Sequence, residues 1–121
     1  PALQHLSLRA TRVGDAGLTA VARACTDLRF LDVSFVAGNV TDDGLSEVAR
    51  CCRELRGLEF SGMHDQITDV GVSAIARGCP RLQQLVADAG STTDASLSEI
   101  AHRCLELLHL DVQSYHSGIT A

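Results

Sequence analysis

The sequence contains no lysine: all ten basic residues are arginines, and fifteen acidic residues leave a net charge of −5. Proteins that bind nucleic acids need clustered positive charge, so this balance argues against phosphate recognition as the main function. We interpret the absence of lysine as codon bias, because alanine, glycine, arginine and aspartate are all abundant. Protection from lysine modification is the alternative.

The chain also lacks a long apolar run. No stretch approaches the roughly 18 apolar residues of a membrane helix, and no signal peptide is recognisable. A length of 121 residues corresponds to one domain at most, and an apolar fraction of 45% is sufficient for a core. We therefore expect one globular domain that binds neither a membrane nor a nucleic acid.

Short metal-binding and catalytic motifs are missing as well, although the chain has five cysteines and five histidines. Zinc sites use closely spaced pairs such as C-x₂-C, and none occurs. The motifs G-x-S-x-G and H-E-x-x-H are absent, and no glycine loop for phosphate is present. We therefore expect no metal, no cofactor, no small-molecule substrate and no enzymatic activity.

The chain does have an internal repeat. The pattern L-x-x-L-x-apolar occurs five times, with starts 25 or 27 residues apart, at Leu3, Leu28, Leu55, Leu82 and Leu107. Its last three positions alternate between apolar and polar side chains or nearly so, which is typical of a strand with one buried face. Residues 1–121 therefore form a single domain of five repeats, the last of them incomplete.

A helical pattern follows each of the first four strands. Leu18, Val21, Ala22 and Cys25 stand at i, i+3, i+4 and i+7, which places them on one stripe of a helix. The three equivalent stripes end at Cys52, Cys79 and Cys104, so these four cysteines are predicted to be buried. An aspartate precedes each stripe and is predicted to cap that helix: Asp15, Asp42, Asp69 and Asp94.

The cysteines are predicted to be unbridged. Packed helices lie about 8–10 Å apart, whereas a disulfide needs two Cα atoms within about 7 Å. Free cysteines at this density, without a secretion signal, indicate an intracellular protein of the cytoplasm or nucleus.

Each unit is thus a strand, a loop, a helix and a turn. Stacking such units gives a right-handed α/β solenoid, with a parallel sheet on the concave face and helices on the convex face. Strand and helix spacings stay constant, so the two extra residues of the longer repeats belong to the loop that leaves the strand. The next helical motif starts at Ile119 and the chain stops at Ala121, so we expect further repeats or a partner to cover both ends.

The repeat resembles a known family. Residues 67–82, I-T-D-V-G-V-S-A-I-A-R-G-C-P-R-L, are similar to the cysteine-containing leucine-rich repeats. These repeats are best known from F-box proteins, where they recruit substrates to ubiquitin ligases, and they also occur in subunits of ciliary and other large assemblies. The resemblance implies a protein-interaction module, either a recruiting adaptor or an architectural subunit.

The chain departs from that family in two ways. No F-box segment is present in the 121 residues. The cysteine or asparagine that usually follows the strand is replaced in every repeat, by Thr11, Val36, Met63, Gly90 and Tyr115.

The concave face is the predicted binding surface, because the non-leucine strand positions point away from the core. The residues predicted to contact a partner protein are Phe30, Asp32, Glu59, Gln84, His109 and Asp111. The three acids would form a row that attracts a basic segment, and Phe30 would be an apolar anchor. A solvated polar face without function is the alternative.

The fourth repeat is predicted to be the least stable. Ala87 and Thr92 stand where other repeats have larger apolar residues, and Ser96 replaces a glycine. Lost methylene groups weaken a core by about 0.8 kcal/mol each.

Overall fold

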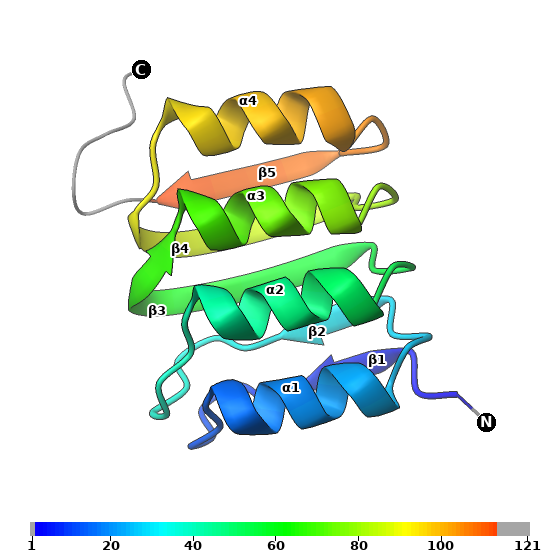
Figure 1. Cartoon of the computed structure of the whole chain (residues 1–121), viewed down its shortest axis with the longest axis vertical. Helices are drawn as coiled ribbons and strands as arrows, with labels where there is room; N and C mark the ends of the chain where they lie inside the picture. The colour runs from blue at the N-terminus through cyan, green and yellow to red at the C-terminus, as the bar shows by residue number, and fades with distance from the viewer. Residues whose placement is uncertain (1, 114–121) are drawn as a thin grey trace.

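The computed structural model describes residues 2–113, and for residues 63–65, 89–91 and 113 it describes the backbone only. Strands and helices alternate along this part of the chain (Figure 1). The elements are β1 (His5–Ser7), α1 (Asp15–Ala24), β2 (Phe30–Asp32), α2 (Asp42–Cys51), β3 (Gly57–Thr68), α3 (Asp69–Gly78), β4 (Gln84–Ser91), α4 (Asp94–Arg103) and β5 (His109–Gln113).

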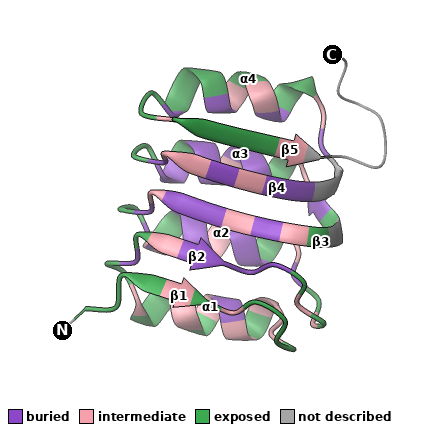
Figure 2. Cartoon of the chain, turned by 180° about the vertical axis from the view of Figure 1, so that it is seen from behind, coloured by how far each residue is buried: buried purple, intermediate pink, exposed green. Residues whose placement is uncertain are grey.

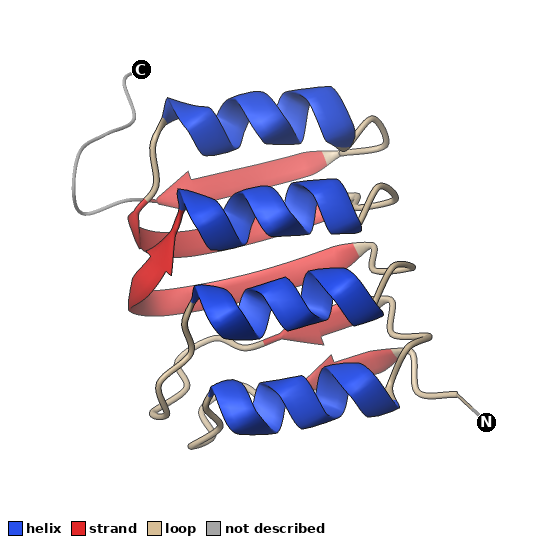
Figure 3. Ribbon diagram, in the orientation of Figure 1, coloured by secondary structure: helices blue, strands red, loops and turns tan. Residues whose placement is uncertain are grey.

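The strands form one parallel sheet in the order β1-β2-β3-β4-β5. All four helices cover the same face of this sheet, and the opposite face is left open (Figure 3). Equivalent leucines are paired from strand to strand, in the series Leu6, Leu31, Leu58, Leu85 and Leu110. The predicted α/β solenoid and the alignment of its five strands are confirmed.

The core lies between the sheet and the helices. Leu28, Leu55 and Leu82 are fully buried there, against helix residues such as Leu18 and Leu45. Each such side chain contributes about 1.5–3 kcal/mol by leaving water. Burial decreases toward both ends of the sheet, where β1 and β5 are mainly exposed or half-buried (Figure 2). The middle repeats therefore supply most of the core.

The two extra residues of the third repeat follow the leucine motif as predicted, but they lie within β3, at a register shift, rather than in a loop. Phe60 pairs with Ala87, 27 residues later, whereas His64 pairs with Ala89, 25 residues later. The two extra residues of this repeat thus lie just after the core of β3. In three successive repeats the residue two places beyond the last core residue has a positive φ: Ala10 (60°), Phe35 (56°) and Gly62 (103°).

The prediction that each aspartate caps its own helix is wrong. The N-cap is the preceding residue, and the hydroxyls of Thr41, Thr68 and Thr93 accept hydrogen bonds from amides in the first turn of their own helices. Each of these threonines has extended backbone angles, which is usual for an N-cap. The aspartate is therefore the first residue inside the helix, and its side chain does not cap that helix.

The aspartates instead connect each repeat to the next. Asp15 accepts hydrogen bonds from the amide of Thr41 at 2.9 Å and from its hydroxyl at 2.5 Å. Asp42 binds Thr68 in the same way, at 2.8 and 2.6 Å, and Asp69 binds Thr93. We call these three Asp–Thr contacts the aspartate ladder.

The cysteines form a second column between repeats. Sγ of Cys52 lies 3.5 Å from the carbonyl oxygen of Cys25, and Sγ of Cys79 lies 3.5 Å from that of Cys52. Burial raises the pKa of Cys52 to about 11 and that of Cys79 to about 12, so both remain protonated donors.

All five cysteines are free thiols. Cys52, Cys79 and Cys104 are buried as predicted, but the prediction for Cys25 is wrong, because it is only half-buried. Cys25 belongs to the first repeat, which has a neighbour on one side only within the described part of the chain.

Candidate functional site

A groove of about 320 Å³ lies on the open face of the sheet, at the amino ends of the strands. Four repeats each contribute two adjacent residues to its lining: Arg29 and Phe30, Arg56 and Gly57, Gln83 and Gln84, Leu108 and His109. The second residue of each pair is the first residue of a strand. We call this hollow the sheet groove.

The outer rim of the sheet groove is held by backbone hydrogen bonds. The amide of Arg56 donates to the carbonyl of Arg29, that of Gln83 to Arg56, and that of Leu108 to Gln83, each at 2.7 Å. These bonds continue the parallel sheet by one position beyond the strands. The backbone positions of the four rim residues therefore form one row, with one residue from each repeat.

Phe30 is the large apolar side chain of the sheet groove. Its ring stacks on His5, with centroids 4.5 Å apart and an angle of 21° between the planes. On the other side it lies over Gly57, where a Cβ atom would come within 2.6 Å of the ring. Only glycine leaves room for the ring in this position, so the contact between Phe30 and Gly57 keeps an aromatic surface half-exposed on the sheet.

The sheet groove has a local positive charge in a chain of net charge −5. Arg29 and Arg56 make no ion pair with any residue of the described chain. Six other arginines do pair with an acid: Arg9, Arg23, Arg50, Arg77, Arg81 and Arg103. Among the residues whose side chains the structure describes, no acid lines the groove. Two of the arginines that lack a counter-ion are thus neighbours on its rim.

The acidic row lies further along the strands, and its charges are already engaged. Asp32 is 6% exposed; its carboxylate accepts a hydrogen bond from the amide of Ser34 at 2.9 Å and lies 3.4 Å from Arg9. Glu59 accepts from the side-chain amide of Gln84 at 3.1 Å. Asp32 is paired in register with Glu59, and Val86 separates Glu59 from Asp111.

The structure brings three of the six predicted contact residues together, since Phe30, Gln84 and His109 all line the sheet groove. Glu59 adjoins it through Gln84, whereas Asp32 ends β2 and bonds to the turn that follows, and Asp111 is exposed on β5.

Sequence reasoning missed the rim residues Arg29, Arg56, Gln83 and Leu108. They occupy the second position of the leucine motif, just before each strand, and only positions inside the strands were considered. Their alignment as one column across the repeats was the available signal.

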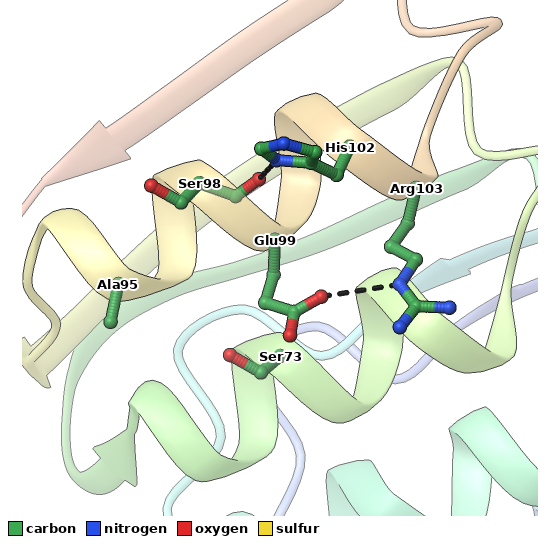
Figure 4. A pocket seen from close by; sticks show the side chains of 6 residues that line it. All are labelled: Ser73, Ala95, Ser98, Glu99, His102 and Arg103. Atoms are coloured by element: carbon green, nitrogen blue, oxygen red, sulfur yellow. Dashed lines mark hydrogen bonds and ion pairs between the residues drawn. The ribbon is translucent and has the colours of Figure 1, made fainter.

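A second hollow lies on the helical side, between α3 and α4 (Figure 4). Its polar groups are engaged with near neighbours: Glu99 pairs with Arg103 at 3.3 Å and with Arg77 at 3.7 Å, and Nδ1 of His102 lies 2.7 Å from the carbonyl of Ser98. This arrangement is typical of a solvated helix surface.

The described residues form neither a metal-binding cluster nor a membrane-spanning helix. No group of three or more histidine, cysteine, aspartate or glutamate side chains is placed there to hold a metal ion. None of the helices in residues 2–113 has both the length and the apolar composition needed to span a bilayer.

Comparison with known families agrees with the geometry. A family model described as "Leucine Rich repeat" matches residues 1–22, which include β1 and the first turns of α1. Five parallel strands, in a row and alternating with helices, extend the same unit over the described chain. The chain folds as a leucine-rich-repeat solenoid. Leucine-rich repeats are characteristic of protein-interaction modules. No curated protein matches the chain significantly.

Proposed function

We propose that this leucine-rich-repeat solenoid is a non-catalytic protein-interaction module that binds its partner in the sheet groove, on the concave face. The observation that carries the proposal is the placement of Phe30. A half-exposed aromatic ring is held between His5 and Gly57, beside two arginines that make no ion pair within the described chain. Aromatic residues and arginine are the side chains that most often dominate binding energy at protein interfaces.

The rigidity of the sheet groove supports this function. Its rim is fixed by backbone hydrogen bonds, and the ring of Phe30 is confined on both faces. A surface that is already ordered loses little conformational entropy when a partner binds. Leu108, which is 84% exposed, extends the apolar surface at the far end of the groove.

Two biological settings fit such a module. Similarity to the cysteine-containing repeats favours an adaptor that recruits a client, as in F-box ligases. An architectural subunit of a large assembly is favoured by the exposed leucines of the last repeat, since Leu105 is 83% exposed and Leu110 is 39% exposed. Five free cysteines support an intracellular, reducing location for either role.

The test is the substitution Phe30→Ala. The proteins that co-purify with the variant and with the unaltered chain are quantified by mass spectrometry. We expect partner capture to fall by an amount equivalent to roughly 2 kcal/mol of binding free energy, because Phe30 would be a central anchor. The matched control is Phe35→Ala, which removes a phenylalanine that is 52% exposed outside the groove. Alanine is tolerated at that backbone position, because Ala10 occupies it in the first repeat. Equal capture by both variants would overturn the proposal.

A further inference from the structure

We infer that the sheet groove selects an acidic segment of its partner, in which carboxylates pair with Arg29 and Arg56 beside one bulky apolar residue. This inference rests on the proposed function and specifies the partner's chemistry. The sequence alone had predicted a basic partner for the acidic row, and the arrangement of charges favours the opposite sign.

The first reason is that Arg29 and Arg56 occupy neighbouring backbone positions and make no ion pair within the described residues. The backbones of Arg29 and Arg56 are joined by a 2.7 Å hydrogen bond, so their side chains leave neighbouring positions on the same rim. Like charges on adjacent strands disfavour each other. A carboxylate ligand removes this repulsion, and guanidinium groups bind carboxylates through two parallel hydrogen bonds.

The second reason is that the nearby acids are occupied elsewhere. Asp32 is bonded to the amide of Ser34 and to Arg9, and Glu59 accepts a hydrogen bond from Gln84. None of these contacts involves the rim arginines. No acid of the described residues supplies a counter-charge for Arg29 and Arg56, which leaves both available to a partner.

The net charge of −5 does not oppose this selection at short range. At physiological ionic strength the Debye length is about 8 Å, so the distant acids of the chain are largely screened. The two arginines act on a bound segment at contact distance, where screening is weak. Two cations are also too few for a nucleic acid, whose binding depends on neutralising many phosphates. An acidic peptide segment is the ligand that two arginines and an apolar surface can satisfy.

The apolar part of the groove specifies what accompanies the acids. Phe30 and Leu108 come from opposite ends of the lining, and the ring of Phe30 covers Gly57. A large apolar side chain of the partner packs against the half-exposed ring of Phe30 or against Leu108. Gln83 on the rim can bond to the partner's backbone, so the segment requires no special sequence beyond its acids and its anchor.

The experiment selects a phage-displayed library of random twelve-residue peptides on the full 121-residue chain at physiological salt. We expect enrichment of aspartate and glutamate next to a bulky apolar residue. The double variant Arg29→Glu/Arg56→Glu should weaken a selected acidic peptide by roughly tenfold or more and shift selection toward lysine and arginine.

The control is Arg12→Glu/Arg53→Glu, which changes the net charge equally at two other exposed arginines that make no ion pair within the described chain. Circular dichroism verifies that both double variants are folded. If the two double variants weaken the acidic peptide equally, the pairing with Arg29 and Arg56 is wrong.

Other outcomes separate the two proposals. Peptides that need Phe30 but show no preference for acids overturn the acidic-segment inference alone. If single-stranded RNA at equal concentration displaces the acidic peptide, the groove recognises phosphate, and the acidic-segment inference is wrong. If no selected peptide depends on Phe30, the sheet groove is not the binding site, and the proposed function fails together with the inference.

Discussion

Two pairs of like charges lie on or just before the neighbouring strands β2 and β3, on the open face of the sheet. The two pairs differ in their contacts within the protein. Asp32 and Glu59 are in register on adjacent strands, and each has a hydrogen-bond partner inside the protein. Arg29 and Arg56 are adjacent in the same way, one position before the strands, and neither has an acidic partner in the described chain. The acidic pair contributes to the fold, whereas the arginine pair remains available to a ligand.

This difference shows that a row of like charges in a sequence is not in itself a binding signal. Both rows look alike in the sequence, and both cost on the order of 0.2–1 kcal/mol in repulsion if nothing compensates them. The contacts decide between them. Asp32 fixes the turn after β2 through the amide of Ser34, and this role is visible only once the turn is formed.

The largest expected effect comes from removing the buried acid. Asp32→Ala leaves the amide of Ser34 without its acceptor in a nearly buried turn, so we expect a loss of about 2 kcal/mol in the free energy of unfolding. Arg29→Ala, on the exposed rim, should change stability by less than about 0.5 kcal/mol. Urea unfolding of both variants measures the contrast. Similar losses for the two would show that the rows do not differ in role.

Thr92 is a buried polar group without a partner, and replacing it should raise stability. Its side chain is fully buried, and Oγ1 finds no hydrogen-bond partner among the described residues. Val13, Val40 and Ile67 occupy the same place in other repeats. Thr92→Val should therefore stabilise the chain by about 1 kcal/mol in urea unfolding. A destabilised variant would mean that the hydroxyl is bonded after all.

The same repeat should also exchange its amide hydrogens faster. The strand at residues 84–87 contains the small side chain of Ala87, and the buried hydroxyl of Thr92 in the same repeat has no hydrogen-bond partner among the described residues. We expect faster exchange there than at residues 57–60, which contain the buried Phe60. Equal or slower exchange of residues 84–87 would count against a weak fourth repeat.

A smaller effect is expected for Arg9, which forms an ion pair with Asp32. Arg9 lies 3.4 Å from Asp32, and its guanidinium is 4.7 Å from the centre of the Phe35 ring, but its side chain is about half-exposed. Arg9→Ala should therefore cost only about 0.5 kcal/mol. The double variant Arg9→Ala/Asp32→Ala should lose less than the sum of the single losses, because the two residues share one contact. Additive losses would show that the pair is not coupled.

The smallest expected effect is a pH dependence at Asp69. Burial opposes its ionisation, but hydrogen bonds from Ser96 and Thr93 outweigh burial and hold the pKa of Asp69 below its usual value. Such a group stabilises the fold above its unfolded pKa of about 4, and this stability is lost as the pH falls through the lower folded value.

Ser96→Gly tests this, because Gly44 and Gly71 occupy the same position in other repeats. The variant loses one hydrogen bond to the carboxylate, so its stability should fall less between pH 7 and pH 3. Urea unfolding at both pH values measures the two losses. An equal loss in the variant and the unaltered chain would exclude this contribution from Ser96.

The parts of the molecule that follow from local periodicity were predictable from the sequence. The period-2 pattern of Leu28 to Val33 and the helical stripe of Leu18 to Cys25 each depend on near neighbours in the chain, and four copies reinforce each other. The parallel pairing of Leu31 with Leu58 follows from stacking equivalent units.

The sheet groove could be predicted only in part, because it depends on contacts between repeats. Gly57 matters because Phe30 lies over it, and the two are 27 residues apart. Asp15 bonds to Thr41 rather than capping its own helix, and Cys25 is half-exposed because of its place in the first repeat. Periodicity gives the position of a side chain on an element but not the partner that it meets across the stack.

The aspartate ladder gives the solenoid a direction of assembly. Each aspartate lies at the start of one helix and accepts hydrogen bonds from the start of the following helix. Asp42, for example, accepts hydrogen bonds from the amides of Thr68 and Gly71. A ribosome releases the earlier repeat first, so the acceptor is in place before its donors emerge. Every newly made helix then starts on a folded template, and growth toward the carboxyl end requires no rearrangement of the repeats already formed.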